Sequence, residues 1–285
     1  MASVASTNED SIRPATGFFA DLVDWVADWG RVVIDTIAAI GDMVLFVWHT
    51  FFWMLTHLPR RGTLLPNFYQ VGVLSLPVVA VTGTFFGMIV ALQVHFQFHS
   101  LGLESRLGAV INMALVRELG PVLAAVMLAG RVGSSMAAEL GTMKVTEQID
   151  ALSSMGIDPI HYLVVPRFLA CLILIPILTI MADFMGVVGG YFYSVIILEI
   201  DKQYYWTNSS DSVDVMDIAI GVIKSLFFGC AIALISCYRG FRSSAGAEGV
   251  GHAATVAFVH SFLTIIALDF LIALALDTFH HWFVH

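Results

Sequence analysis

The chain has 285 residues, of which 58% are hydrophobic and only 12% are charged. This composition lies outside the usual range for soluble domains and indicates a protein whose solvent is the lipid bilayer. The formal net charge of −9, without a basic stripe, argues against a nucleic-acid partner.

The N-terminal quarter is predicted to lie outside the bilayer core. Residues 1–15 are polar, lack a signal-peptide pattern, and are expected to be flexible. Residues 16–62 are predicted to form an interfacial helical region, because polar side chains recur on one helical face and tryptophans lie elsewhere around the cylinder. Those polar residues are Asp21, Asp24, Asp28, Arg31, Asp35, Asp42 and His49. Within this region, residues 39–58 favour an interfacial or re-entrant element, and a sixth membrane span is the alternative.

Residues 63–285 are predicted to form a single membrane domain. Five apolar stretches in it are long enough to cross roughly 30 Å of hydrocarbon. They are 71–98, 109–132, 163–198, 215–238 and 252–276. The third is longer than one crossing needs, so we expect tilt, a kink near Pro176 or an extension beyond the bilayer.

Charges in the connections between spans predict the orientation. One set of connections is basic, with Arg60, Arg61, Arg131, Lys144, Arg167, Arg239 and Arg242. The opposite loops hold Arg106 and Lys202 beside Glu104, Glu199, Asp201, Asp211 and Asp214. Because Lys and Arg are enriched in cytoplasmic loops, the basic side is predicted to be cytoplasmic. Five spans then leave the N-terminus in the cytoplasm and the C-terminus outside.

Two adjacent charged residues, Arg117 and Glu118, lie within the second apolar stretch. Ionisable groups at that depth cost several kcal/mol unless they are paired or face water, so we expect both to face an interior cavity. Pro121 lacks a backbone donor and is expected to bend the helix and to free carbonyl groups near Arg117. The alternative is that both residues form buried pairs with charged residues of later spans. Those residues are Asp183, Lys224 and Asp269, for which we favour a structural role.

Small residues recur every four positions along the same segment. This small-residue ridge consists of Ala125, Ala129, Gly133, Ala137 and Gly141. Such ridges let helix backbones approach closely in lipid. Packing within the chain and a subunit interface are equally compatible with the pattern, and either one turns the ridge away from lipid.

Residues 142–155 are too short and too polar to cross a membrane. The apolar positions Val145, Ile149 and Leu152 share one helical face, and Gly156 follows as a cap, so we predict an amphipathic cytoplasmic helix. Joined to two membrane helices, it is suited to transmit motion from an external motor, and a connector resting on the membrane is the alternative. The residues expected to take part in this coupling are Glu139, Lys144, Thr146, Glu147, Gln148 and Asp150.

Motifs for catalysis or cofactor binding are missing from the sequence. It contains no GxxxxGK[ST], HExxH or GxSxG motif, so we predict neither an ATP site, nor catalytic residues, nor a bound cofactor. Cys171, Cys230 and Cys237 have no paired spacing, which indicates neither a disulfide framework nor a metal site. We therefore do not expect an enzyme.

Several sequence motifs resemble one family. They read LGTMKVTEQIDAL (140–152), MGIDPIHYLVVPR (155–167), VIKSLFFG (222–229), SSAGAEGVGHAAT (243–255) and ALDFLIAL (267–274). In this order they strongly resemble the MlaE/YrbE permease family, the membrane subunits of lipid-trafficking ABC transporters, from about Val71 to the end. The chain departs from the family at His252, where Arg is usual, and at Asp183, in a stretch expected to be wholly apolar.

The resemblance implies a fold, partners and a function. The fold is all-α, with an interfacial N-terminal helix, five spans and a coupling helix between the second and third. The implied partners are a second copy of the chain, an ATPase subunit that uses ATP and Mg, an outer MCE-domain substrate-binding protein and a small STAS-type cytoplasmic subunit. The implied activity is movement of glycerophospholipids between the bacterial inner membrane and the envelope or outer membrane, which maintains lipid asymmetry.

Two other functions compete with this interpretation. A proton-coupled secondary transporter would use Glu118, Asp183, Lys224 and Asp269, and would work without an ATPase partner. An intramembrane lipid-modifying enzyme would use His95, His99, His280 and His281, although no spaced carboxylate or serine completes such a site. Transport without an ATPase would favour the first, and altered lipid products would favour the second.

Overall fold

The computed structural model describes residues 18–56, 61–100 and 106–284, and every regular element in these ranges is a helix. The all-α prediction is therefore confirmed. In chain order the elements are α1 (Phe18–Thr56), α2 (Arg61–Val71), η1 (Val73–Ser75), α3 (Leu76–His99), α4 (Leu107–Ala114), η3 (Leu115–Leu119), α5 (Gly120–Leu128), η4 (Ala129–Gly133), α6 (Ser134–Val145), α7 (Gln148–Ser154), η5 (Ile160–Val164), α8 (Val165–Tyr191), η6 (Phe192–Ile197), α9 (Lys202–Ser212), α10 (Val215–Phe241) and α11 (Gly246–Val284).

The chain divides into two compact units, residues 1–48 and residues 49–285. The described part of the first unit is one helical stretch, residues 18–48 of α1. The predicted flexible segment 1–15 lies outside the described residues, as do the side chains of Asp21, Asp24 and Asp28. The interfacial placement of this helix stays a prediction.

Within the described ranges, six helical stretches are long and apolar enough to cross a membrane by length and composition. They are Val33–Thr56, Gly62–His99, Leu107–Val145, Ile160–Ile197, Val215–Phe241 and Gly246–Leu276. The last five match the five predicted spans, of which only the third extends past its helical stretch, by the single residue Leu198. The first covers the segment that the sequence assigns either to the interface or to a sixth span.

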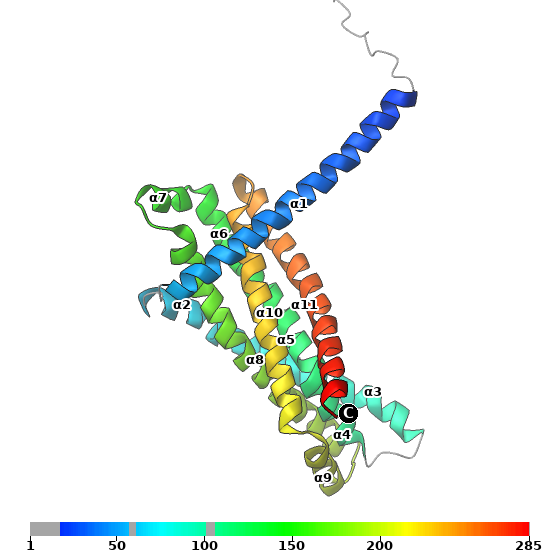
Figure 1. The fold of residues 1–285 in the computed structure, drawn as a ribbon. Helices are drawn as coiled ribbons and strands as arrows, with labels where there is room; N and C mark the ends of the chain where they lie inside the picture. Colours follow the sequence, from blue (N-terminus) through cyan, green and yellow to red (C-terminus); the bar gives the residue numbers. More distant parts are fainter. Residues whose placement is uncertain (1–17, 57–60, 101–105, 285) are drawn as a thin grey trace, which may run out of the picture. The chain divides into compact units, whose positions relative to one another are not determined.

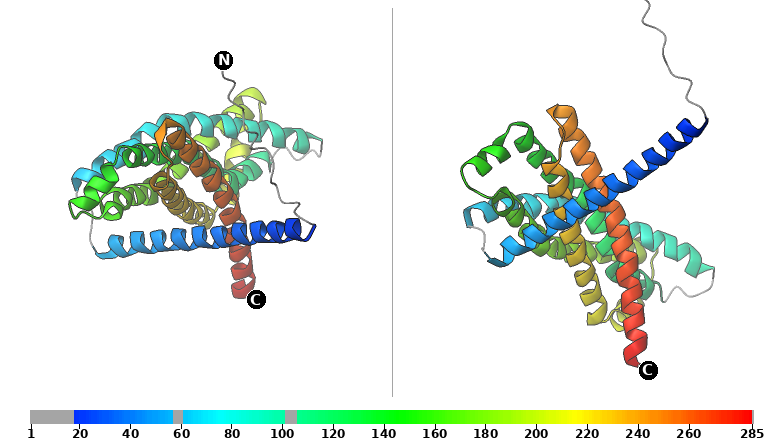
Figure 2. Two further views of the ribbon diagram at one scale, coloured as in Figure 1. Left: turned by 90° about the horizontal axis from the view of Figure 1, so that it is seen from above. Right: turned by 45° about the horizontal axis from the view of Figure 1, so that its top comes forward.

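The helices of the second unit run beside one another (Figures 1 and 2). α8 packs along α3 and α10, and α6 packs against both α10 and α11. The connection containing α7 and the turn between α10 and α11 lie at one end, whereas α9 packs on α4 at the other end (Figure 1). Among the described residues, the basic connections at α7 and after α10 and the acidic connection at α9 therefore lie at opposite ends of this bundle.

Glycines allow the backbones of α3 and α8 to touch. A Cβ atom added at Gly87 would lie 1.9 Å from the carbonyl oxygen of Gly186, and one at Gly189 would lie 2.1 Å from the carbonyl oxygen of Thr84. Either distance is far below van der Waals contact, so only glycine fits at this crossing. Close approach through small residues is the usual way for helices to associate in lipid.

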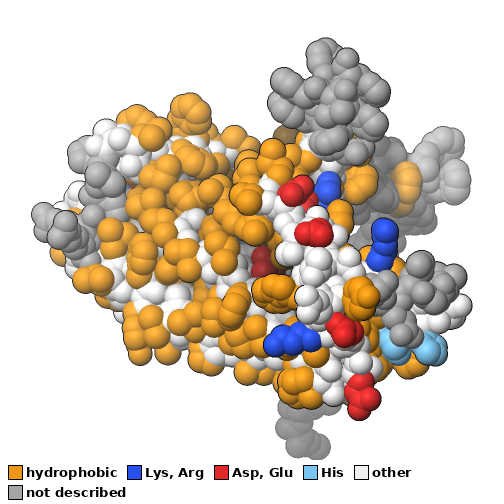
Figure 3. Space-filling model, turned by 90° about the horizontal axis from the view of Figure 1, so that it is seen from below, with side chains coloured by type: hydrophobic (Ala, Val, Ile, Leu, Met, Phe, Trp, Pro, Cys, Tyr) orange, Lys and Arg blue, Asp and Glu red, His pale blue; other side chains and the backbone are white. Residues whose placement is uncertain are grey.

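The second unit carries the surface expected of a membrane protein. Large hydrophobic side chains such as Val81, Phe85 and Phe270 are more than half exposed. Seen from the α9 end, hydrophobic side chains spread over a wide area, and charged side chains gather in a smaller region beside it (Figure 3). Such an apolar exterior suits contact with lipid chains or with another membrane helix.

α9 is anchored by one aromatic side chain. Tyr205 is 1% exposed, and its ring meets that of Tyr191 edge-on with centroids 5.7 Å apart. Gly108 in α4 leaves room for it, because a Cβ there would lie 2.8 Å from Cδ2 of Tyr205. Burial raises the pKa of Tyr205 to about 12, so its hydroxyl stays neutral.

Candidate functional site

The span from Leu107 to Val145 is an α-helix interrupted twice by π-helical turns, η3 and η4. π turns widen a helix locally and often occur at functional sites. η3 contains Arg117 and Glu118 and ends where Gly120 and Pro121 begin α5. Because Pro121 has no backbone donor, the sequence favours an irregular turn at this point.

α10 passes very close to this irregular turn. A Cβ added at Gly221 would lie 2.6 Å from the carbonyl oxygen of Val116 and 3.1 Å from Cγ of Pro121. Lys224 follows one turn later on the same helix and is completely buried. The glycine contact thus brings the long lysine side chain within reach of the polar residues of η3.

Lys224 joins three helical segments through two carboxylates. Its Nζ donates a hydrogen bond to Oε2 of Glu118 in η3 and lies 3.0 Å from Oδ1 of Asp269 in α11. An ammonium group with no solvent contact needs such partners, because an unpaired charge in a low-dielectric interior is costly. This arrangement accounts for a lysine in the middle of an apolar span.

Arg117 has a different partner on α10. Its Nη1 lies 3.7 Å from Oδ1 of Asp217, and its Nε lies 4.0 Å from Oε1 of the adjacent Glu118. Asp217 is held in turn at the start of α10, where the backbone N–H of Asp214 donates to Oδ2 of Asp217 at 3.2 Å. Asp217 was not identified from the sequence, although it follows Asp214 by three residues, which is typical of a helix N-terminus.

The resulting cluster has a buried part and an accessible part. The side chains of Arg117 and Glu118 each keep 43% of their surface accessible, whereas Lys224 keeps none and Asp269 keeps 25%. Two cations and three carboxylates give a formal charge of −1 when all are ionised. Glu118 is thus ion-paired and still accessible from outside the helix bundle, and the role of Arg117 and Glu118 in an interior cavity stays a prediction.

The expectation that Asp183 belongs to this structural network is wrong. Its Oδ1 is buried without a hydrogen-bond partner in the described part of the chain. The carboxylate lies against Gly120, where an added Cβ would come within 1.7 Å of that oxygen. Among the described residues no ion pair joins it to Lys224, and periodicity within a single helix could not show which carboxylates reach that lysine.

The small-residue ridge packs inside the chain. Its five residues are buried, and a Cβ added at Gly133 would lie 2.8 Å from Oγ of Ser236 on α10. Farther along, Gly141 faces Ser243 and Val250, and the backbone of Ala137 lies against Gly240. Of the two interpretations left open by the sequence, the structure shows packing within one chain.

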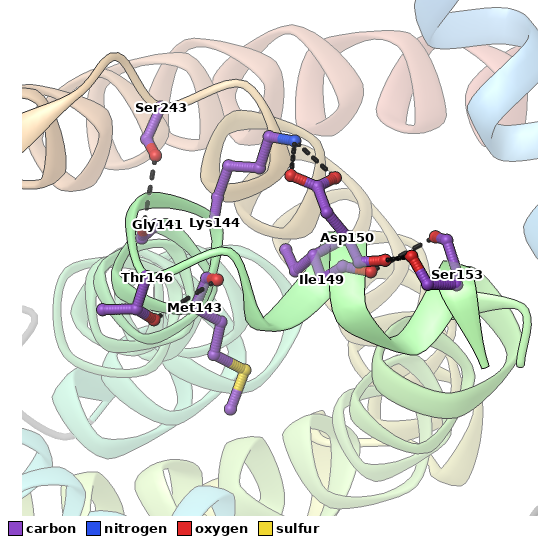
Figure 4. A network of polar contacts seen from close by, with 9 residues as sticks. Gly141, Met143, Lys144, Thr146, Ile149, Asp150, Ser153 and Ser243 are labelled. Carbon is purple, nitrogen blue, oxygen red and sulfur yellow. Dashed lines mark hydrogen bonds and ion pairs between the residues drawn. The ribbon is translucent and has the colours of Figure 1, made fainter.

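The prediction of one continuous helix over residues 142–155 is wrong. α6 continues to Val145, a turn follows, and α7 covers only Gln148–Ser154. Glu147 adopts a left-handed conformation with φ of 58°, which ends α6 and redirects the chain. Lys144 Nζ spans the turn to both carboxylate oxygens of Asp150, at 2.9 and 3.0 Å (Figure 4).

The residues predicted for coupling fall into two groups. Thr146, Glu147, Gln148 and Asp150 are exposed around the turn, and Ile149 is buried beneath them. Glu139 lies apart from this surface, because its Oε2 is 3.1 Å from Nη2 of Arg167, a side chain that is 6% exposed. Glu139 thus ties α6 to α8.

Among the described residues, His95 and His99 are the predicted enzyme histidines whose placement is known. The rings of His95 and His99 lie 5.4 Å apart on α3. The side chains of His280 and His281 fall outside the described residues, so their predicted role stays untested.

An all-helical chain with several candidate spans, an ion-paired cluster between them and a polar connection at one end has the features of a transporter permease. A family model described as Permease MlaE matches residues 64–275. The chain belongs to this family, and it is an ABC transporter permease of the MlaE type.

Individual relatives agree with the family model. The chain is 46% identical over 243 residues to a probable ABC transporter permease protein of Rickettsia felis, which covers 85% of this chain and 94% of the relative. It is 42% identical over 214 residues to a probable ABC transporter permease protein of Synechocystis, covering 75% and 81%. It is 33% identical over 252 residues to the intermembrane phospholipid transport system permease protein MlaE of Haemophilus influenzae, covering 88% and 97%.

Proposed function

We propose that this chain is the membrane subunit of an ATP-driven transporter that moves glycerophospholipids between the inner membrane and the cell envelope or outer membrane. The observation that carries the proposal is the half-exposed pair Arg117 and Glu118 inside an apolar span, where Lys224 holds Glu118 and Asp217 lies near Arg117. The name of the Haemophilus influenzae relative supports the same substrate class. Maintenance of lipid asymmetry is the role that such movement would serve.

The cluster can recognise both halves of a zwitterionic headgroup. Arg117 makes ion-pair contacts at 3.7 and 4.0 Å but no hydrogen bond to another described residue, so its N–H donors remain available to a phosphate. Glu118 can share its accessible carboxylate with an ammonium group. Lys224 would hold Glu118 in place throughout, because its own burial leaves it no other role in binding.

We further propose that the motor is a separate ATPase subunit, which binds ATP and Mg and docks at the turn between α6 and α7. The exposed side chains of Thr146, Glu147 and Gln148 support this assignment, since they lie on a short connection between two membrane helices. The Lys144–Asp150 bridge would stiffen the turn and so help to transmit motion from the ATPase subunit to the membrane helices. The other expected partners are a second copy of the chain, an outer MCE-domain protein and a small STAS-type subunit.

The proposed orientation places α7 and the N-terminus in the cytoplasm and the C-terminus outside. It is supported by the basic residues near the α7 end, including Lys144, Arg167 and Arg239, and by Asp201 and Asp211 at the α9 end. This distribution follows the excess of Lys and Arg found in cytoplasmic loops.

Purification with native partners tests the proposal. We expect a tagged chain to retain an ATPase subunit and phospholipid, both identified by mass spectrometry. Arg117→Gln should lower the amount of bound phospholipid while the ATPase is retained. Lys202→Gln, which removes a positive charge from the exposed start of α9, serves as the control and should leave lipid occupancy unchanged. Equal lipid in all three proteins, or no ATPase subunit, would contradict the proposal.

A further inference from the structure

A cavity of about 310 Å³ lies beside α9, and none of the charged residues of the Lys224 cluster lines it. Its walls come from α4, η3, α8, α9 and the first turn of α10. Most of the lining is aliphatic or aromatic, and the polar side chains that reach it are Asn112, Asp183, Ser209 and Ser210. The cavity is large enough for a small headgroup or for part of an alkyl chain, but not for a whole phospholipid.

The polar groups of this cavity mainly offer hydrogen-bond acceptors. Oδ1 of Asp183 and Oδ1 of Asn112 are both buried without a hydrogen-bond partner in the described part of the chain. The hydroxyls of Ser209 and Ser210 already donate to the carbonyl oxygens of Tyr205 and Thr207, at 2.6 and 3.0 Å, which leaves their lone pairs free. A ligand that satisfies this site must supply hydrogen-bond donors.

No basic side chain of the described residues supplies the missing positive charge. Among the described residues Asp183 forms no ion pair, whereas Lys224 and Arg117 are matched with Glu118, Asp269 and Asp217. A carboxylate among apolar side chains is unfavourable until a cation or donor reaches it. Asp183 thus has a buried carboxyl oxygen, and no cation of the described residues pairs with it.

The entrance of the cavity favours an organic cation. Trp206 and Phe184 contribute to its lining and are 64% and 62% exposed, so both side chains can also be reached from outside the protein. Aromatic faces attract ammonium groups, and the aliphatic walls suit an attached hydrocarbon. A quaternary ammonium would match the charge, but it has no N–H to satisfy the unpartnered oxygens.

We propose that this cavity binds a primary ammonium group carried by an amphiphile, with Asp183 as its counter-ion. The group can belong to an aminophospholipid headgroup or to a free long-chain amine. The proposal concerns a site separate from Arg117 and Glu118, and it does not depend on transport or on an ATPase.

Binding to the purified full-length chain in detergent tests the proposal. Dodecylamine is the probe, and dodecanol and dodecyltrimethylammonium are compared with it by equilibrium dialysis. We expect dodecylamine to bind saturably, and both comparison compounds to bind at least tenfold more weakly. Asp183→Asn should weaken dodecylamine binding at least tenfold. Asp211→Asn removes the same charge from an exposed position of α9 and should change nothing.

A second variant keeps the test valid if Asp183→Asn does not fold. Trp206→Ala alters an exposed ring, so it should leave the melting temperature unchanged and weaken dodecylamine binding several-fold. Dodecylamine binding unaffected by both variants, or equal binding of dodecanol, would overturn the proposal.

Native mass spectrometry distinguishes the two sources of the ammonium group. Retention of phosphatidylethanolamine over phosphatidylcholine, lost in Asp183→Asn, would identify a lipid headgroup. Dodecylamine binding without this lipid preference would identify a free amine.

Discussion

Lys224 is the residue on which the charge cluster depends. It is fully buried and contacts carboxylates from two other helical segments, so it fixes the register of η3, α10 and α11 at one point. Glu118 and Asp269 would both lose their compensating charge without it. The cluster is therefore expected to respond very differently to loss of the cation and to loss of the outer arginine.

Replacing Lys224 by Met should destabilise the protein by about 3 kcal/mol or more, because it leaves two carboxylates close together without a cation. Thermal unfolding in detergent measures the loss. Arg117→Gln is the matched comparison, and we expect a much smaller effect, since Arg117 is half-exposed and its ion pairs are long.

A double variant separates the contribution of the ion pair to stability from that of packing. Combining Lys224→Met with Glu118→Gln should recover part of the lost stability, because fewer unpaired charges remain. If the two losses simply add, Glu118 and Lys224 do not depend on each other and the interpretation of the cluster fails.

The sequence shows which residues need explanation but not which of them meet. Arg117, Glu118, Lys224 and Asp269 stand out because ionisable residues are rare in apolar spans. Their pairing depends on the widened turn at η3 and on the close approach of α10, both of which are set by tertiary packing. For the same reason the sequence could not show that Asp183 does not pair with the residues of the Lys224 cluster.

At the scale of elements, glycine contacts hold the helices together. The sequence analysis identified the ridge on the second span because it repeats over five positions. It missed the crossing of α3 and α8, where Gly87 and Gly186 belong to two shorter patterns on different helices. A repeat on one helix reveals a packing face. The helix surface that packs against this face can be identified only from the three-dimensional structure.

Gly87→Ala should destabilise the protein by about 1–3 kcal/mol, because the added methyl group would lie 1.9 Å from a backbone oxygen of α8. Gly251→Ala is the control. A Cβ there meets nothing within 4 Å, so alanine should be neutral or stabilise the helix by up to about 1 kcal/mol. Equal melting temperatures for both variants would show that the α3–α8 contact is looser than the structure indicates.

The connection after α6 shows another limit of periodicity. Val145, Ile149 and Leu152 fit one helical face, but the chain reverses its local geometry at Glu147, and Val145 lies exposed while Ile149 is buried. A spacing of four residues cannot distinguish one helix from two short ones joined by a turn.

Charge reversal at this turn should weaken ATPase docking without preventing membrane insertion. Glu147→Lys changes an exposed side chain, so we expect reduced pull-down of the ATPase subunit and normal expression. Asp150→Lys alone would also break the bridge to Lys144. The double variant Lys144→Asp with Asp150→Lys keeps that bridge with its two charges exchanged. It therefore tests whether ATPase docking depends on the rigidity of the turn or on the surface charges at these positions. Unchanged pull-down by Glu147→Lys would place docking elsewhere.

At the scale of the whole molecule, composition and hydropathy predicted five of the candidate spans, and the family resemblance implied the all-helical class. The boundaries shifted, most clearly in the second span, which continues to Val145 because the small-residue ridge stays packed against α10 and α11 beyond Val132. The segment Val33–Thr56 is also apolar enough to cross, so hydropathy alone does not decide its placement.

Transport in reconstituted liposomes tests the central claim most directly. The chain is co-purified with its ATPase subunit, and movement of a labelled phospholipid is followed with ATP, without ATP, and with an imposed proton gradient. We predict that movement requires both the ATPase and ATP, and that the chain alone hydrolyses no ATP. Movement driven by the proton gradient in the absence of the ATPase would contradict the claim and would favour a secondary transporter.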